Sequence, residues 1–295
     1  MKLIRSSFEV LPQAPGLEGM YKQIEIGARN CYKSEDKIAE GSAEKMVEFL
    51  TGRKHYSPLE HGTVYLKIPY NLHPKDCYNP PYSRIDKTTK YRNNPYSKVS
   101  DKISLGPHGV DEFEFVTTNY RVLVENGWLD DLKYLCEPTE HHEKRVSVMV
   151  TCAIGISREF NRHRTFSVSE QSTRYCNYSK DKFGVEITYV IPSWATNLSP
   201  EYNDLECSGI DHNELVLLDS LKQGERHYMV MMRNGAKPQE ARDVLPLATA
   251  TTVMYTGFLS DWKHFFELRT SNGAHPDARA IAIPLLEEFR KLNLL

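Results

Sequence analysis

The residues of this chain with the clearest potential for chemistry lie in one short segment, residues 162–174. The segment has R-H-R at 162–164, seven further residues, and S-T-R at 172–174. Each guanidinium group presents a planar fork of donors that matches phosphate oxygens two at a time. Three such groups close together repel one another unless an anion neutralises them. We therefore predict that this arginine segment binds a multiply charged phosphate ligand.

A solvated basic face is the alternative interpretation, because most charge runs are exposed. An apolar stretch upstream, 146–160, and a Tyr-rich run downstream, 175–178, argue against it. A nucleic-acid-binding surface is a further alternative. Against it, the whole chain has a formal net charge of −2. A local basic cluster on a nearly neutral chain is what a small-ligand pocket requires.

The composition is that of a globular protein, with 295 residues of which 40% are apolar and 26% charged. No apolar run reaches membrane-spanning length, and residues 1–5 contain no signal-peptide core. We expect a cytoplasmic protein with neither a membrane nor a nucleic-acid partner. The six cysteines form no C-x-x-C pair, which argues against a zinc ribbon or a redox dithiol.

Other common site signatures are absent. There is no G-x-G-x-x-G or Walker A sequence, so a nucleotide is not expected on a Gly-rich loop. His141 and His142 are adjacent, and neighbouring side chains on a helix point about 100° apart, so they rarely chelate one ion. A solvated turn or a packing role is the better interpretation, and no metal site is predicted.

The elements that position the arginine segment follow from hydrophobic periodicity and turn residues. Helices are predicted over 17–31, 42–52, 117–126, 129–136, 146–160, 212–233, 238–242, 260–269 and from Pro276 onward with a kink at Pro284. Strands are predicted over 63–68, 185–191 and 249–255. Residues 71–111 predict a long excursion with little regular structure. Because strands and helices do not alternate regularly, we predict an α+β fold forming a single domain over 1–295.

Two further arginines, near the C-terminus, add to those of the arginine segment. Arg242 precedes an apolar stretch, 244–247, and Arg269 follows the F-F-E-L run at 265–268. Ordinary salt bridging is the alternative for each, for Arg242 with Glu240 or Asp243. Taken with the arginine segment, they supply enough guanidinium groups for two phosphorylated ligands.

The pattern R-H-R-x7-S-x-R resembles the signature motif of the flavin-dependent thymidylate synthases at all five fixed positions. Further blocks are similar to those of the family and occur in the same order: A-R-N-C-Y-K-S at 28–34, L-E-H-G-T at 59–63, R-D-V-L-P at 242–246, and Leu268-Arg269 followed by His275. The resemblance covers about residues 28–280.

This resemblance implies an enzyme that makes dTMP from dUMP. The one-carbon unit comes from 5,10-methylenetetrahydrofolate, and FAD reduced by NADPH supplies the hydride. It also implies an antiparallel-rich central sheet flanked by long helices, in a homotetramer whose active sites are shared between subunits. Cysteine-dependent thymidylate synthases have a nucleophile in a Pro-Cys-His context that no cysteine here has. A non-catalytic relative that binds nucleotide or flavin is the alternative.

The resemblance also implies roles for individual residues. Arg174 and Arg242 would hold the dUMP phosphate with help from backbone N–H groups near Ser172 and Thr173, and Arg269 would be the catalytic residue beside the uracil. The substrate-binding residues implied are Glu159, Arg162, Glu170, Gln171, Ser172, Thr173, Arg174, Arg242 and Arg269. The cofactor-binding residues implied are His61, Thr63, Arg162, His163, Arg164, Glu170, His264 and His275.

The chain departs from the family pattern at three places. Phe258-Leu259-Ser260 stands where many members have Asn-Ala-Arg, His264 replaces an Asn, and Glu159 replaces a Gln. A carboxylate close to the dUMP phosphate would repel it. We therefore expect Glu159 to pair with an arginine or to point away, and the FAD contacts outside the motif to be rearranged.

Overall fold

The computed structural model describes residues 1–69, 87–101, 103–104, 112–202 and 209–295. Its internal contacts divide the chain into two compact units. Unit 1 comprises Met1–Leu11, Ala28–Lys37 and Val148–Leu295, and unit 2 comprises Pro12–Gly27 and Ile38–Ser147. Helices and antiparallel strand pairs occur in both, which confirms the predicted α+β class. The single-domain organisation stays a prediction.

A four-stranded sheet, which belongs to unit 1 except for the first three residues of β7, has the strand order β2-β7-β10-β8. Its strands are β2 (Ser7–Leu11), β7 (Arg145–Ala153), β10 (Ala250–Phe258) and β8 (Ser167–Glu170). Strand β8 is part of the arginine segment and pairs antiparallel with β10, so that Glu170 lies opposite Val253. The buried Asn30 ties the two strands together by donating to the carbonyl oxygens of Ser169 and Thr252 at 2.8 and 2.9 Å.

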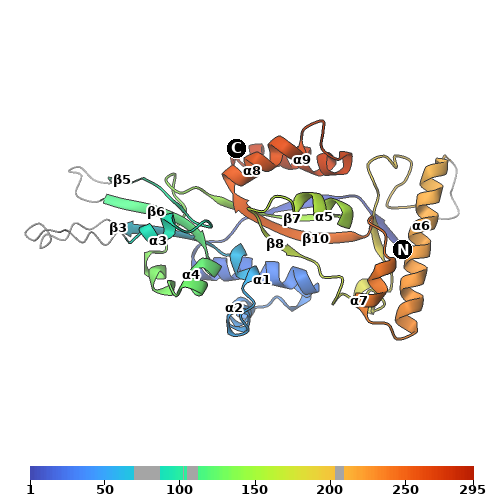
Figure 1. Ribbon diagram of the computed structural model, residues 1–295, viewed down its shortest axis with the longest axis horizontal. Helices are drawn as coiled ribbons and strands as arrows, with labels where there is room; N and C mark the ends of the chain where they lie inside the picture. The colour runs from blue at the N-terminus through green and yellow to red at the C-terminus, as the bar shows by residue number, and fades with distance from the viewer. Residues whose placement is uncertain (70–86, 102, 105–111, 203–208) are drawn as a thin grey trace, which may run out of the picture. The chain divides into compact units, whose positions relative to one another are not determined.

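Three helices of unit 1 lie beside this sheet: α5 (Ile154–Phe160), α8 (Leu259–Arg269) and α9 (Pro276–Lys291) (Figure 1). An aromatic cluster joins them to the strands. The ring of Phe160 lies 5.1 Å from that of Phe265, and Trp262 packs 4.5 Å from Phe166 and 5.2 Å from Phe289. Edge-to-face and tilted ring contacts of this kind fix helix positions strongly. The C-terminal end of α8 is therefore held firmly against the arginine segment.

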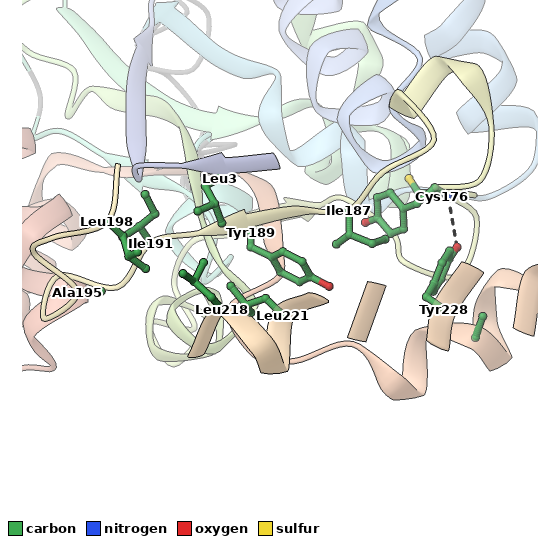
Figure 2. Close-up of a cluster of buried hydrophobic side chains, with 12 residues drawn as sticks. Leu3, Cys176, Ile187, Tyr189, Ile191, Ala195, Leu198, Leu218, Leu221 and Tyr228 are labelled. Carbon is green, nitrogen blue, oxygen red and sulfur yellow. Dashed lines mark hydrogen bonds between the residues drawn. The ribbon is translucent and has the colours of Figure 1, made fainter. Parts of the chain in front are cut away.

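A second core in unit 1 lies under α6 (His212–Arg233). Strand β1 (Lys2–Ile4) pairs parallel with β9 (Thr188–Val190), and Figure 2 shows Leu3 and Tyr189 packed with Leu218 and Leu221 of α6. After α6 the chain forms α7 (Pro238–Ala241) and the 3₁₀ helix η6 (Arg242–Val244). Another 3₁₀ helix, η5 (Asp181–Phe183), lies earlier in this unit. Ala241 is part of this core and Val244 packs against it, so the core holds the intervening Arg242 in place.

Unit 2 contains a sheet in which β6 (Glu112–Asn119) pairs antiparallel with β3 (Thr63–Pro69), β4 (Lys98–Val99) and β5 (Ile103–Ser104). Its helical elements are α2 (Ser42–Gly52), η2 (Ser57–His61), α3 (Thr89–Arg92), α4 (Tyr120–Asn126) and η4 (Leu129–Tyr134). Helix α1 (Gly16–Tyr32) and η1 (Glu35–Lys37) contain residues at the divisions between the units. None of the described helices is both long and apolar enough to span a membrane.

The helix predicted over 146–160 is wrong in its first half. The chain forms β7 up to Ala153 and only then turns into α5. Val146, Val148 and Val150 alternate with less buried or polar residues, and β-branched side chains favour a pleated strand. Their apolar spacing satisfies a helical period as well, and pairing within the sheet decides between the two.

The helix predicted over 117–126 begins too early for a related reason. Strand β6 continues to Asn119, whose side-chain oxygen then accepts from the backbone N–H of Val122 and caps α4. Within the excursion at 71–111, the described part contains α3, β4 and β5, so the expectation of little regular structure is wrong there. Residues 70–86, 102 and 105–111 lie outside the described residues.

Candidate active site

The arginine segment runs from the end of α5 through β8 and into the turn that follows, all within unit 1. The side chain of His163 is buried, whereas Arg162 and Arg164 on either side of it are exposed. Within the described part of the chain, neither of these two arginines makes a side-chain hydrogen bond or an ion pair. Two guanidinium groups therefore remain available to an anionic ligand.

Arg269, at the end of α8, uses all three of its nitrogen atoms to reach the arginine segment and Glu159 of α5. Its Nε donates to Nε2 of His163 at 3.0 Å. Its Nη1 donates to Oε2 of Glu159 at 3.0 Å, and its Nη2 donates to the backbone oxygen of Glu159 at 2.5 Å. The expectation that Glu159 pairs with an arginine is therefore confirmed.

The electrostatics of His163 follow from this contact. Burial, together with the positive charge of Arg269 and the neighbouring His264, lowers the pKa of His163 to about 4. The imidazole is accordingly neutral at pH 7, and its Nε2 lone pair is free to accept from Arg269. The ring also lies 5.0 Å from that of Phe265, which limits its rotation.

Glu170 sits in a ring of hydrogen-bond donors. Its Oε1 accepts from the hydroxyl groups of Ser157 and Thr251 at 2.7 and 3.1 Å, and its Oε2 accepts from Nδ2 of Asn161 at 3.2 Å. The hydroxyl of Tyr255 donates in turn to Oδ1 of Asn161 at 3.0 Å. Sequence reasoning identified Glu170 and missed the residues that hold it. No sequence signal singled out Ser157, because Ser147 and Thr151 are polar residues of the same stretch.

Arg242 also contacts the arginine segment. Its Nη1 donates to Oγ1 of Thr173 at 3.1 Å, so its partner is neither Glu240 nor Asp243. The neighbouring Arg174 is exposed, and its guanidinium carbon lies 5.5 Å from the centre of the Tyr175 ring. The described structure thus places two guanidinium groups beside the S-T-R turn, each with donors left for a phosphate.

Other polar groups of the same turn already form hydrogen bonds within the protein. The backbone N–H of Ser172 donates to the carbonyl oxygen of Cys31 at 2.9 Å. The side chain of Gln171 is buried and donates to the hydroxyl of Tyr178 at 3.2 Å. The Oγ of Ser172 accepts from the backbone N–H of Arg174 at 3.3 Å. These bonds shape the turn, and the N–H of Ser172 is not free to bind a ligand.

The remaining predicted residues differ in their surroundings. His264 is exposed with its ring 6.0 Å from that of His163, and it lies 3.7 Å from Glu267. His275 caps α9, because its Nδ1 accepts from the backbone N–H of Asp277 at 3.2 Å. The ring nitrogen of His275 that forms the cap is therefore engaged.

His61 and Thr63 belong to unit 2, where both are buried. Burial, with a smaller contribution from Arg145, lowers the pKa of His61 to about 3, so its imidazole is uncharged at pH 7. The backbone N–H and carbonyl of Thr63 bond to the side-chain amide of Gln13, each at 2.8 Å. Both residues are thus part of the interior of their own unit.

The described cysteines are poor candidates for a nucleophile. Burial raises the pKa of the thiols of Cys31, Cys136 and Cys176, and raises that of Cys152 to about 12. A thiol whose pKa is raised contains little of the reactive thiolate at neutral pH. Cys77 and Cys207 lie outside the described residues.

The His141-His142 pair does not form a metal site. The Nδ1 of His142 accepts from the backbone N–H of Thr139 at 3.1 Å, and its Nε2 lies 3.2 Å from the carbonyl oxygen of Leu66. Both ring nitrogens are therefore used in hydrogen bonds. No group of three or more His, Cys, Asp or Glu side chains in the described residues is arranged to hold a metal ion.

One of the three departures from the family pattern, Phe258-Leu259-Ser260, lies at the start of helix α8. Phe258 is buried, and its backbone N–H donates to Oδ2 of Asp261 at 3.0 Å. Ser260 is exposed two residues later. The side chain of Phe258 therefore packs in the interior, where a polar side chain at this position would not be expected.

Residues 134–293 match the model of a protein family described as thymidylate synthase complementing protein. Several curated proteins named flavin-dependent thymidylate synthase are similar to this chain. That of Corynebacterium efficiens is 32% identical over 145 residues, which is 46% of this chain and 55% of the relative. That of Mycobacterium avium is 33% identical over 144 residues, covering 46% and 54%. That of Thermococcus kodakarensis is 29% identical over 163 residues, covering 54% and 60%.

The chain spans about half the length of the curated relatives it matches. A solved structure of the UMP/dUMP methylase PolB from Streptomyces cacaoi, bound with 5-Br dUMP, aligns over 99% of this chain and 93% of its own at 17% identity. Its TM-score of 0.44 is too low to establish a shared fold. The family model, in contrast, covers more than half of the chain and includes the arginine segment, Arg242 and Arg269. This chain belongs to the thymidylate synthase complementing protein family.

Proposed function

We propose that this protein is a flavin-dependent thymidylate synthase that methylates dUMP to dTMP. The carbon donor is 5,10-methylenetetrahydrofolate, and NADPH reduces the bound FAD. The observation that carries the proposal is that two distant arginines converge on the arginine segment, Arg242 on Thr173 and Arg269 on His163. Such convergence gathers guanidinium groups where a phosphorylated substrate needs them.

Arg174 and Arg242 hold the dUMP phosphate in this proposal. The guanidinium of Arg174 is exposed and that of Arg242 is half-buried, and Arg242 makes a single hydrogen bond to a neutral hydroxyl. A phosphate dianion would supply the negative charge that this turn lacks. Thr173 fixes Arg242 for that contact, while Ser172 and Gln171 shape the turn.

Arg269 is the catalytic residue in this proposal and lies beside the uracil ring. A guanidinium has five N–H donors, and His163 and Glu159 accept from three of those in Arg269. Two donors remain for the uracil oxygens. They would stabilise the anion formed when N3 loses its proton, which enriches C5 in electrons for attack on the folate methylene.

The arginine segment also fits the proposed FAD. Arg162 and Arg164 are exposed cations without an acidic partner in the described residues, which suits the diphosphate of a dinucleotide. When bound, FAD supplies the hydride for the reaction. His163, Glu170, His264 and His275 are the further cofactor contacts that we propose, whereas His61 and Thr63 are buried in the interior of unit 2. Because Phe258 is buried, its side chain adds none.

We further propose that the protein is cytoplasmic and acts as a homotetramer that shares its active sites between subunits. A shared site suits this chain because Arg162 and Arg164 are exposed on the surface of the single subunit. Size-exclusion chromatography with light scattering tests the assembly: four copies are expected, and a stable monomer with full activity would contradict it.

The proposed activity is tested with purified protein. We expect a flavin absorbance spectrum, and dTMP formation that requires dUMP, 5,10-methylenetetrahydrofolate and NADPH together. The buried Phe258 favours a second candidate, a non-catalytic relative that binds flavin or nucleotide. Bound flavin without dTMP formation would support that second candidate. Absence of flavin, of dUMP binding and of dTMP formation together would contradict both candidates.

A further inference from the structure

We infer that Glu159 is a positioning residue that fixes the guanidinium of Arg269 in the active site. Its carboxylate and its own backbone oxygen accept from Nη1 and Nη2 of Arg269 at 3.0 and 2.5 Å. One residue thus occupies both ends of the guanidinium fork, and His163 takes the remaining nitrogen. The inference deepens the proposed function and rests on it for the role of Arg269.

The two partners sit on elements that hold their separation. Glu159 is next to Phe160 at the end of α5, and Arg269 follows Phe265 by one helical turn in α8. The rings of Phe160 and Phe265 pack 5.1 Å apart, and both side chains are buried. The Glu159–Arg269 contact is therefore built on a rigid pair of helices, as a site that must hold a group to within a fraction of an ångström requires.

Charge gives a second reason for this role. The side chain of Arg269 is 13% exposed, and Glu159 is the one carboxylate of the described residues within ion-pair distance of it. His163 contributes a lone pair and no charge. A largely buried guanidinium without a counter-ion is strongly unfavourable. Glu159 therefore keeps Arg269 at this place before any substrate arrives.

Hydrogen-bond acceptance and negative charge can be separated by substitution. Glu159→Gln keeps a side-chain acceptor oxygen and removes the charge, whereas Glu159→Ala removes both; the backbone oxygen that accepts from Nη2 remains in each variant. If positioning is the role, Glu159→Ala should lower kcat by about 100-fold, the loss typical of a displacement near 1 Å. The KM for dUMP should change far less, because Arg174 and Arg242 still hold the phosphate. In Glu159→Gln, which keeps the side-chain acceptor but removes the counter-ion of Arg269, we expect a smaller loss of kcat, about 10-fold.

The pKa of His163 gives a measurement that does not depend on turnover. Burial and, to a smaller extent, the charge of Arg269 keep the pKa of His163 at about 4. If Glu159→Ala releases Arg269, the pKa of His163 should rise, while burial still keeps it below its ordinary value. In Glu159→Gln it should stay low. NMR of the enzyme with ¹³C-labelled histidine measures this titration, and the resonance is assigned by its loss in His163→Gln.

Glu287→Ala is the matched control, because Glu287 is exposed on α9 and pairs only with Arg290 at 2.7 Å in the described structure. It should change neither kcat nor the titration of His163. Unchanged kcat and an unchanged His163 pKa in Glu159→Ala would overturn the inference. So would a Glu159→Gln variant that loses as much kcat as Glu159→Ala while melting at the parent temperature. If the parent makes no dTMP, the proposed function fails, and the His163 titration alone then decides whether Glu159 fixes Arg269.

Discussion

The Nε of Arg269 donates to Nε2 of His163 at 3.0 Å, although 106 residues separate them in the chain. The bond requires a neutral imidazole, and burial beside the arginine keeps His163 neutral. It joins the last turn of α8 to the centre of the R-H-R motif. A motif read from sequence as a phosphate site is therefore also the anchor of the proposed catalytic arginine.

The neutral state of His163 makes stability depend on pH. Its pKa is about 4 in the folded protein, below the ordinary 6.5. As the pH falls from about 6.5 to 4, the unfolded chain binds a proton at this residue and the folded protein does not, so the free energy of unfolding decreases. The decrease is at most about 3 kcal/mol.

Denaturant unfolding of the parent and of His163→Gln at pH 7 and pH 4.5 measures this contribution. The variant should lose less stability between the two pH values, because it has no imidazole to titrate. His61, whose pKa is also low, is present in both proteins and cancels in the comparison. An equal loss in both proteins would show that His163 is not held neutral.

The donors around Glu170 should matter for both stability and turnover. Ser157→Ala removes the buried hydroxyl that donates to Glu170 at 2.7 Å, and it should lower the free energy of unfolding by about 1–2 kcal/mol. We expect dTMP formation to fall as well, because Thr251 and Asn161 alone then hold the carboxylate. Ser220→Ala, which alters an exposed hydroxyl on α6, is the control. Parent-like melting and turnover in Ser157→Ala would contradict the assigned role of this contact.

Gly257 in β10 is required by a close approach. A Cβ atom there would lie 2.3 Å from Cδ1 of Phe166, and that ring cannot yield easily because Trp262 packs against it at 4.5 Å. Gly257→Ala should therefore destabilise the protein by about 1–3 kcal/mol. Gly273→Ala, where a Cβ would meet nothing within 4 Å, should melt like the parent. Equal melting temperatures for the two variants would show that the packing around Phe166 is loose.

Local sequence predicts best where one local signal dominates. The helix over 212–233 is predicted at its exact bounds because it is long and ends at Asn234-Gly235. The segment 146–160 is predicted wrongly because its apolar spacing satisfies both periods, and only the sheet selects the strand. Local propensity cannot report a partner that lies a hundred residues away.

The residues of the candidate site also divide into those that the sequence identifies and those that it does not. The arginines can be found from sequence because their chemistry is unusual at any position. The family resemblance singled out Glu159, and charge then gave two alternatives, of which the structure shows pairing with an arginine. Ser157, Asn161 and Thr251 could not be found, because common polar residues acquire a role only when α5 and β10 bring them to Glu170. Their role depends on where the fold places them and not on their residue types.

The most direct test of the account is dTMP formation by Arg269→Ala, with bound flavin followed by its absorbance. Arg269 is proposed to stabilise the uracil anion, while Arg162 and Arg164 hold the flavin and are not altered. We predict that the variant retains FAD and forms no dTMP above background. Normal dTMP formation by a folded Arg269→Ala enzyme would contradict the account.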